Sequence, residues 1–430
     1  MILLAVFLIL CIGLIIGLPV PFAFGAALIY LGYFADTEVS TFLAGGHWRM
    51  NSIVLLAIPL FILAGSIMNR GRIAEPLVDM AALFFGRIKG GLSASAVFAS
   101  AVFGSISGSA AATLTCIGGV MLPRLEKANY PKGFSAALIS NAAPLGLLIP
   151  PSSIQIIYAW ITRQSVLKCF LATVVPGLVL ITLLIVVNFV MMHRQKGVAV
   201  EPEPVDFVRE VRKRTVYASP AFLMPVIILG GIYGGVMTPT ESAGIAVLCA
   251  LPIGFLVYRG LNWKSFKDAV IEASITTGAV MVMFFMVMIV SRLLVFEDIP
   301  RLAQEFVYSI SENPVVILLM INLLLVAIGM LMDDVSGVLL SAPLLLPMVQ
   351  DIGIDPIQFA AIIGVNLGMG NITPPTAPLL YLGARVGSTS VNSMLKPTMI
   401  MILFAWIPTL LLATFVPSLS LWLPEFVLGR

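Results

Sequence analysis

The chain has 430 residues, of which 60% are hydrophobic and only 10% are charged, and its mean hydropathy is +1.07. Soluble domains carry about 25% charged residues, so this composition excludes a soluble enzyme, a disordered protein and a nucleic-acid-binding protein. It predicts an all-α polytopic membrane protein that lies in a lipid bilayer. At about 20 residues per crossing plus loops, we expect about ten to twelve crossings.

The chain begins with an apolar segment over residues 1–20. It lacks a basic start and a small-residue cleavage site, so we expect a retained first membrane segment rather than a signal peptide.

Two uncharged stretches in the body of the chain have polar centres. Residues 90–123 carry no charge, and a Gly/Ser-rich run at 104–109 divides them into arms of about 15 residues. Residues 313–350 are interrupted only by Asp333 and Asp334. One interpretation is two ordinary long helices, with Gly104 and Gly108 as a GxxxG packing motif. Adjacent aspartates at membrane depth are costly unless they face a cavity, which favours two re-entrant helical hairpins.

The chain contains two Pro-Pro pairs, Pro150-Pro151 and Pro374-Pro375. Proline removes an N–H donor and disfavours helical backbone at the residue before it. We therefore predict broken helices near residues 147–152 and 371–376. Backbone carbonyls freed at membrane depth need a cavity or a bound ion beside them. The alternative interpretation of each Pro-Pro segment is a simple loop between two helices.

The Pro-Pro pairs close two similar runs, residues 122–153 and 346–377. The matched residues are Pro123 and Pro347, Pro131 and Pro356, Phe134 and Phe359, Asn141 and Asn366, and Gly146 and Gly370. The loop at 124–133 has a net charge of +2, whereas the corresponding loop at 348–357 has a net charge of −2. Because basic loops face the cytoplasm, the sequence predicts two inverted repeats, an architecture of secondary transporters.

A hydrophilic interval separates the repeats. Residues 194–214 hold ten charged side chains, six of them basic. We predict a first repeat at 1–193, a cytoplasmic linker at 194–215 and a second repeat at 216–430.

Five segments resemble the large membrane subunit of TRAP (tripartite ATP-independent periplasmic) transporters. They are residues 52–69 (SIVLLAIPLFILAGSIMN), 104–113 (GSISGSAAAT), 230–247 (GGIYGGVMTPTESAGIAV), 329–347 (GMLMDDVSGVLLSAPLLLP) and 371–378 (NITPPTAP). The family pattern more often ends Pro-Pro-Val-Gly where this chain has Pro374-Pro375-Thr376-Ala377, and Asn371 is unusual. These departures concern the identity of the substrate.

The resemblance implies a transporter of the bacterial inner membrane that imports an organic acid with the sodium gradient. It also implies two partners, a periplasmic substrate-binding protein and a small four-helix membrane subunit. The implied mechanism is of the elevator type, related to that of divalent-anion/sodium symporters. In it, a transport domain (about 89–190 and 311–413) slides against a scaffold (about 1–86 and 216–308).

Sodium is a hard cation that favours oxygen ligands, and hairpin tips and broken helices supply them. The candidate sodium ligands of the first repeat are Ser105, Ser107, Ser109, Thr113 and Asn141. Those of the second repeat are Asp333, Asp334, Ser336, Asn366 and Thr373.

A substrate carboxylate would lie between the two breaks, where helix N-termini carry partial positive charge. The candidate donors to it are Ser107, Ser152, Ser153 and Thr376, and the resemblance supports Ser107 and the serines after the prolines. The sequence leaves open whether the substrate is sialic acid, a C4-dicarboxylate, a sugar acid or a sulfonate.

Two alternatives remain. Proton coupling on the same scaffold would use the acids set in apolar runs, namely Asp333, Asp334, Glu241 and Glu272. For Glu241, the run from Thr238 also fits a helix cap with Pro239 in the first turn. An intramembrane enzyme or a channel is the other class, but the sequence has no HExxH, GxSxG or His-Asp cluster.

Overall fold

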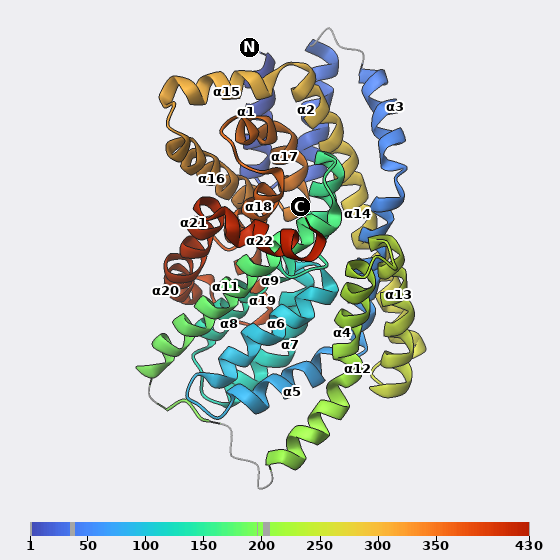
Figure 1. The fold of residues 1–430 in the computed structure, drawn as a ribbon, viewed down its shortest axis with the longest axis vertical. Helices are drawn as coiled ribbons and strands as arrows, with labels where there is room; N and C mark the ends of the chain where they lie inside the picture. Colours follow the sequence, from blue (N-terminus) through green and yellow to red (C-terminus); the bar gives the residue numbers. More distant parts are fainter. Residues whose placement is uncertain (1, 35–38, 196, 201–206, 430) are drawn as a thin grey trace.

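A computed structural model of the chain describes residues 2–34, 39–195, 197–200 and 207–429. This part of the chain is helical and contains no β-strand (Figure 1). The first half contains α1 (Ile2–Ile15), α2 (Val20–Phe34), α3 (Val39–Met50), α4 (Ala57–Arg70), α5 (Ala74–Phe85), α6 (Gly91–Ser107), α7 (Ala110–Lys127), α8 (Lys132–Ala142), α9 (Leu145–Leu148), α10 (Ser153–Thr162) and α11 (Val166–His193).

The second half contains α12 (Phe207–Tyr233), α13 (Pro239–Pro252), α14 (Trp263–Phe296), α15 (Ile299–Ile310), α16 (Pro314–Leu331), α17 (Asp334–Asp351), α18 (Pro356–Gly370), α19 (Pro378–Val386), α20 (Val391–Met401), α21 (Ile407–Phe415) and α22 (Pro417–Leu428). A 3-10 turn at Ile53–Leu56 precedes α4, and π-helical turns at Ile253–Val257 and Ile402–Trp406 follow α13 and α20. The predicted linker lies partly outside the described residues, and its last part, from Phe207, forms the first turns of α12.

Among the described residues, seven helices are long and apolar enough to cross a membrane, or eight if the bent pair at residues 132–162 counts as one span. This is fewer than the ten to twelve crossings expected from length. Several segments are too short on their own, such as Val20–Phe34, Gly91–Ser107 and Pro356–Gly370. A hairpin arm or half of a broken helix uses chain length without completing a crossing.

Both predicted hairpins are present. Helices α6 and α7 have 17 and 18 residues and are joined at Gly108, whose φ of +59° suits glycine. Helices α16 and α17 have 18 residues each and are joined at Met332 and Asp333. In each hairpin a polar side chain caps the second helix, since Ser109 accepts from the Ala112 N–H and Asp333 from the Val335 N–H.

Both predicted helix breaks are present as well. Helix α9 ends at Leu148 and α10 begins at Ser153, so the break contains Pro150-Pro151. Helix α18 ends at Gly370 and α19 begins at Pro378, so the second break contains Pro374-Pro375. Both Pro-Pro peptide bonds are cis.

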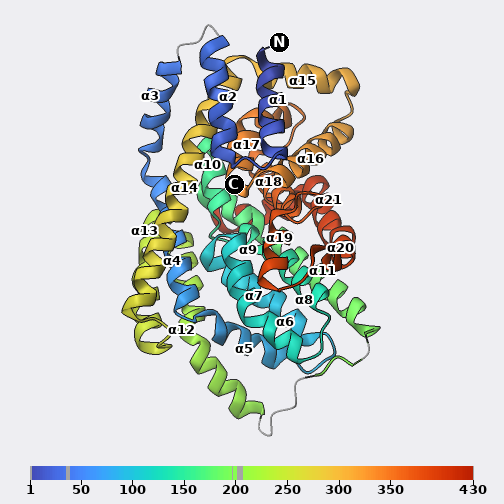
Figure 2. The same ribbon diagram turned by 180° about the vertical axis from the view of Figure 1, so that it is seen from behind.

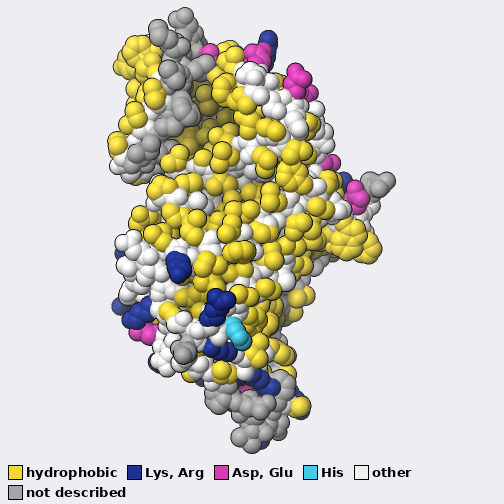
Figure 3. All heavy atoms as spheres, turned by 90° about the vertical axis from the view of Figure 1, so that its left-hand side faces the viewer, with side chains coloured by type: hydrophobic (Ala, Val, Ile, Leu, Met, Phe, Trp, Pro, Cys, Tyr) yellow, Lys and Arg dark blue, Asp and Glu magenta, His cyan; other side chains and the backbone are white. Residues whose placement is uncertain are grey.

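The two hairpins enter from opposite ends of the molecule. Figure 1 shows α5, which precedes α6, at the lower end with the start of α12, whereas α15, which precedes α16, crosses the upper end. Figure 2 shows the same arrangement from behind. In Figure 3 a broad hydrophobic band lies between an upper end with acidic side chains and a lower end where Lys and Arg gather. The repeats are therefore inverted, with the basic end on the side predicted to be cytoplasmic.

The broken helices of the two repeats pack against each other. Helix α10 contacts α17 and α18, and α19 contacts α7 and α8. Tyr158 on α10 donates a hydrogen bond of 2.6 Å to the Pro356 carbonyl, and Gln155 donates one of 3.0 Å to the Ala360 carbonyl. Helix α4 packs against α13 and α14, where Arg70 pairs with Glu272 at 2.8 Å, and α14 also contacts α17.

Candidate functional site

The tips of the two hairpins meet at a cavity of about 290 Å³, which we call the central cavity. Its lining comes from both hairpins, from both helices that follow the breaks, and from α4 and α14. The polar lining residues are Ser107, Ser109, Ser153, Thr276, Asp333, Asp334 and Asn371. Residues more than 200 positions apart in sequence thus share one cavity.

Four helices begin at the central cavity. Its lining includes Ser109, which caps α7, Ser153 and Asp334, which begin α10 and α17, and Pro378, which begins α19. The first N–H groups of a helix lack partners within the helix and carry a partial positive charge. Four helix N-termini around one cavity favour the binding of an anion there. The hydroxyl and carboxylate oxygens nearby favour the binding of a cation.

The first hairpin tip is a hydroxyl cluster. The Ser107 and Thr113 hydroxyls lie 3.0 Å apart, and Thr113 donates to the Ser109 carbonyl at 2.8 Å. Ser153 donates to the Gly108 carbonyl at 2.9 Å, which ties the tip to α10. Ser107 is buried yet lines the cavity, so its hydroxyl can serve a bound molecule without water competing freely for it.

The second hairpin tip carries the acidic groups. Asp333 accepts from the Ser336 hydroxyl at 2.7 Å and from the Val335 N–H at 3.1 Å, so its carboxylate is engaged in capping α17. Asp334 accepts a hydrogen bond from the Asn371 amide. That bond joins the tip of the second hairpin to the second helix break.

Three predicted hydroxyls are engaged with nearby carbonyls instead. Ser105 donates to the Val102 carbonyl at 2.7 Å and Thr373 to the Met369 carbonyl at 2.6 Å, while Thr376 donates to the Met330 carbonyl. None of the three is in the lining of the central cavity.

Three other predicted residues are deeply buried and keep a polar atom without a hydrogen-bond partner. These atoms are Asn141 Oδ1, Asn366 Oδ1 and Ser152 Oγ. The amide groups of Asn141 and Asn366 donate to the carbonyls of Ala137 and Ile362, each at 2.8 Å. Buried oxygens without partners are costly, and the asparagines occupy matched positions in the two repeats. They fit a pair of cation sites, one in each repeat.

Sequence reasoning did not identify the wall formed by α4 and α14. Ile58, Phe61 and Ile62 come from α4, and Thr276 and Val280 come from α14. Thr276 is followed by Thr277 in a long, mostly apolar helix, and the local sequence does not indicate which of the two faces a cavity. A neighbouring cavity of about 200 Å³ shares Ser107, Ser109 and Thr276 and extends to Asn69 and Glu272. Polar side chains therefore extend from the central cavity toward the basic end of the molecule.

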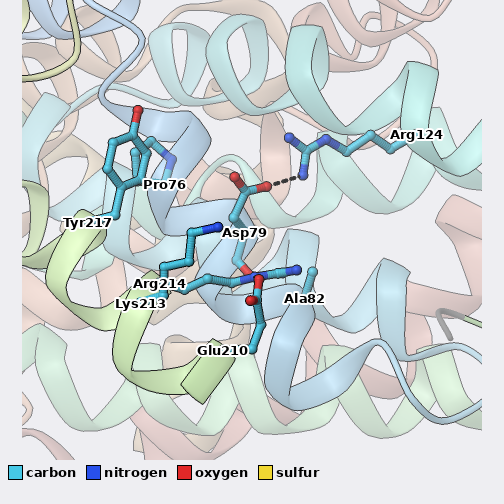
Figure 4. Close-up of a pocket in the computed structure, with 8 residues that line it drawn as sticks. All are labelled: Pro76, Asp79, Ala82, Arg124, Glu210, Lys213, Arg214 and Tyr217. Atoms are coloured by element: carbon cyan, nitrogen blue, oxygen red, sulfur yellow. Dashed lines mark hydrogen bonds and ion pairs between the residues drawn. The ribbon is translucent and has the colours of Figure 1, made fainter. Parts of the chain in front are cut away.

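A larger cavity, of about 550 Å³, lies at the basic end between α5, α7 and α12 (Figure 4). Arg124 on α7 pairs with Asp79 on α5 at 2.5 Å, and Arg214 on α12 donates to the Asp79 carbonyl at 3.0 Å. Arg214 also pairs with Glu210 at 2.8 Å. The cavity lies away from the helix breaks. The Asp79–Arg124 ion pair and the hydrogen bond from Arg214 to the Asp79 carbonyl together join three helices.

Comparison with known families gives one match that spans nearly the whole chain. The description "Tripartite ATP-independent periplasmic transporter, DctM component" matches residues 3–419.

Two curated relatives show the same similarity. The C4-dicarboxylate TRAP transporter large permease protein DctM of Pseudomonas aeruginosa is 34% identical over 375 residues, which cover 87% of this chain and 86% of the relative. The isethionate TRAP transporter permease protein DctMQ of Oleidesulfovibrio alaskensis is 32% identical over 412 residues, which cover 95% of this chain and 64% of the relative.

Among solved structures, the chain is similar to the Alcanivorax borkumensis YdaH transporter, described as having an unusual topology. The TM-score is 0.61 at 14% identity, and the match covers 91% of this chain and 90% of the other. At this identity the likeness concerns the fold alone.

Proposed function

The chain belongs to the DctM family, a component of tripartite ATP-independent periplasmic transporters, and on that premise we propose that it imports an organic acid anion with sodium ions across the bacterial inner membrane. It is a multi-pass transporter permease, as its relatives are, and not an enzyme. Family membership leaves four properties to be proposed, namely the coupling ion, the substrate class, the partners and the motion.

One observation carries the proposal, namely the central cavity at which two inverted hairpins and two broken helices meet. A channel needs no paired helix breaks. A carrier needs a site that can face either side, and inverted repeats supply two related half-sites for this.

Sodium would bind to oxygens of both repeats. In the first repeat no acid is present at the tip, so Ser105, Ser107, Ser109, Thr113 and Asn141 would offer neutral oxygens. In the second, Asp333, Asp334, Ser336, Asn366 and Thr373 would include two carboxylates. The buried Oδ1 atoms of Asn141 and Asn366 lack partners, which supports a cation near each. A cation beside Asp334 would also offset the cost of burying that carboxylate.

The substrate anion would bind in the central cavity. Ser107 and Ser153 line it, and the helix N-termini add N–H donors. Ser152 directly precedes α10, and its hydroxyl has no hydrogen-bond partner. The Thr376 hydroxyl donates to the Met330 carbonyl instead, so Thr376 would stabilise the second helix break. The substrate would be a carboxylate such as sialic acid or a C4-dicarboxylate.

Two partners complete the proposed transporter. A periplasmic substrate-binding protein would deliver the anion, and a small four-helix membrane subunit would brace the scaffold. The relative named DctMQ extends well beyond its match to this chain, which is consistent with a permease joined to a further subunit.

The proposed motion is that of an elevator. The transport domain (about 89–190 and 311–413) would carry the central cavity past the scaffold (about 1–86 and 216–308). Polar residues extend from the cavity toward the basic end, and in this proposal they would line the exit in the inward position.

The test is uptake in proteoliposomes that contain the chain, its small subunit and its binding protein. Radiolabelled succinate, N-acetylneuraminate and isethionate are offered with an inward sodium gradient, an inward proton gradient or neither. We expect saturable uptake of one acid that requires sodium. Uptake that follows the proton gradient and ignores sodium would refute sodium coupling.

Proton coupling is the second candidate, and the adjacent Asp333 and Asp334 favour it. The other two acids considered for this role have structural partners. Glu241 forms a capping box with Thr238, accepting from its N–H at 2.7 Å, and Glu272 pairs with Arg70. A sodium affinity that does not change with pH would argue against this candidate.

A further inference from the structure

The asparagines at matched positions of the two repeats, Asn141 and Asn366, each use the side-chain nitrogen for two hydrogen bonds. One bond from each goes to the carbonyl four residues earlier in the same helix, at 2.8 Å. The other bond of Asn366 goes to Asn322 Oδ1 at 2.9 Å. The other bond of Asn141 goes to Thr398 Oγ1 at 3.4 Å. Each amide thereby presents its oxygen, which has no hydrogen-bond partner among the described residues.

Asn366 belongs to a buried series of hydrogen bonds that we call the amide relay (Asn366, Asn322 and Thr414). Asn322 of α16 accepts from Asn366 and donates to Thr414 Oγ1 of α21 at 3.0 Å. Gln358 of α18 donates to the Thr414 carbonyl at 3.0 Å, which fixes the far end of the relay. If the Asn366 amide were turned over, its oxygen would face Asn322 Oδ1 and the Ile362 carbonyl, and acceptors would meet without a donor. The relay therefore fixes where the Asn366 oxygen points.

One membrane span serves both asparagines. Helices α20 and α21 belong to a single apolar span, Val391–Phe415, with a π-helical turn between them. Helix α20 packs against α8, which carries Asn141, and α21 packs against α18, which carries Asn366. Thr398 and Thr414 are thus the contributions of this span to the two amides.

The π-helical turn brings Thr398 and Thr414 closer to a common side of the span. The two residues are 16 positions apart, and in a regular α-helix of about 3.6 residues per turn they would point about 160° away from each other. In the turn, the Ile407 N–H bonds to the Ile402 carbonyl, five residues earlier. A π-helical turn takes up one extra residue, which reduces this angle to about 60°. A single span can therefore reach an amide in each repeat.

Trp406 of the same turn lies where the two broken helices meet. Its ring is fully buried, and a Cβ atom at Gly368 of α18 would lie 3.0 Å from the ring and 3.2 Å from Pro144 Cβ. Gly368 follows Asn366 by two residues. Pro144 follows Asn141 by three residues. The rigid indole ring therefore holds the span beside both asparagines.

We propose that the α20–α21 span positions the sodium-ligating amides of both repeats, through Thr398 in the first repeat and through Thr414 and Asn322 in the second. The inference rests on the proposed function, because it takes Asn141 and Asn366 as sodium ligands. The three positioning residues act through the asparagines and not on the ion. They raise the affinity for sodium because an oxygen that is already held in place loses less freedom when the ion binds.

Sodium-dependent thermal stabilisation tests the positioning role without any need for transport. The full chain, purified in detergent with its small subunit, is melted over a series of sodium chloride concentrations, and choline chloride keeps the ionic strength constant. A bound ion raises the free energy of unfolding, so the rise in apparent melting temperature reports the affinity for sodium. Each variant is compared with its own melting temperature in choline chloride, which separates lost affinity from lost stability.

We expect the sodium concentration for half-maximal stabilisation to rise about fivefold in Thr414→Val and about tenfold in Asn322→Leu. Thr398→Val should raise it about threefold, because the bond to Thr398 is longer at 3.4 Å. Thr414→Ser keeps the hydroxyl group and should keep the affinity. Thr409→Val is the matched control, because the buried Thr409 hydroxyl donates to the Ala405 carbonyl of its own span at 2.8 Å.

The failure of this inference can be told apart from the failure of the proposed function. If sodium does not stabilise the wild type, the proposed sodium coupling fails, and the positioning role fails with it. If the wild type, Thr414→Val and Asn322→Leu respond at the same sodium concentration, the positioning role is overturned and sodium coupling stands. A rise in Thr409→Val as large as in Thr414→Val would also overturn it, because any buried hydroxyl would then have the same effect.

Discussion

Gly104 of α6 lies against Gly146 of α9 so closely that a Cβ atom at position 104 would be 2.5 Å from the Gly146 Cα atom. The second repeat has the same contact between α16 and α18, since a Cβ atom at Gly370 would lie 2.7 Å from the Gly329 Cα atom. Each hairpin therefore touches the broken helix of its own repeat backbone to backbone. This contact holds the helix break next to the hairpin tip.

Gly104→Ala and Gly370→Ala should each lower stability, because neither backbone can yield without opening the contact. Overpacking of this kind costs about 1–3 kcal/mol, which a lower apparent melting temperature in detergent would report. Gly119→Ala on α7 is the matched control, because a Cβ atom there meets nothing within 4 Å. Equal melting temperatures for Gly104→Ala and Gly119→Ala would contradict the importance of the contact.

The hairpins and helix breaks were predictable from sequence because their signals are local. Two consecutive prolines break a helix where a single one, such as Pro176 or Pro343, is tolerated inside it. Asp333 and Asp334 are costly in any apolar run. The cap at Glu241 was predictable for the same reason, and the structure confirms it.

The lining of the central cavity was less predictable, because it depends on tertiary approach. The sequence cannot indicate that the Thr376 hydroxyl reaches the Met330 carbonyl, 46 residues away. It also gives no sign that Thr276 of α14 faces the hairpin tips. A polar residue in an apolar helix has the same local pattern whether it faces a cavity or its own backbone.

Ser107→Ala should impair transport more than Ser105→Ala. Ser107 lines the central cavity with its hydroxyl 3.0 Å from Thr113, whereas the Ser105 hydroxyl is engaged with the Val102 carbonyl in its own helix. Loss of one hydrogen bond to a charged group costs about 1.5–3 kcal/mol, so we expect KM for the anion to rise at least tenfold in Ser107→Ala. Proteoliposome uptake measures this, and equal kinetics in the two variants would remove Ser107 from the site.

Asp334→Asn should affect sodium dependence more than Asp333→Asn. The Asp333 carboxylate caps α17, and asparagine is an equally good N-cap, so Asp333→Asn should fold normally. Asp334 lines the central cavity and accepts a hydrogen bond from the Asn371 amide. We expect the sodium concentration for half-maximal uptake to rise about tenfold in Asp334→Asn and less than threefold in Asp333→Asn. The reverse order would assign the cation to Asp333.

Removal of the Asp79–Arg124 pair should shift the transport domain away from the position seen here. The pair joins α5 of the proposed scaffold to α7 of the proposed transport domain (Figure 4), so it cannot persist after a large slide. Half-exposed pairs contribute about 0.2–1 kcal/mol, which permits at most about a fivefold change in the two populations. Asp79→Asn and Arg124→Gln should therefore slow MTSET labelling of Ala111→Cys, a lining residue of the central cavity, in inside-out vesicles.

A matched ion pair within one domain separates this effect from a general loss of charge. Lys132 and Glu126 pair at 2.7 Å at the same end of the molecule, and both belong to the proposed transport domain. Glu126→Gln should leave the labelling rate unchanged, and the swap Asp79→Arg with Arg124→Asp should restore it. High potassium chloride should reduce the difference between wild type and Asp79→Asn, because salt screens exposed charges. If Glu126→Gln slows labelling as much as Asp79→Asn does, the Asp79–Arg124 pair has no special part in holding the domains together.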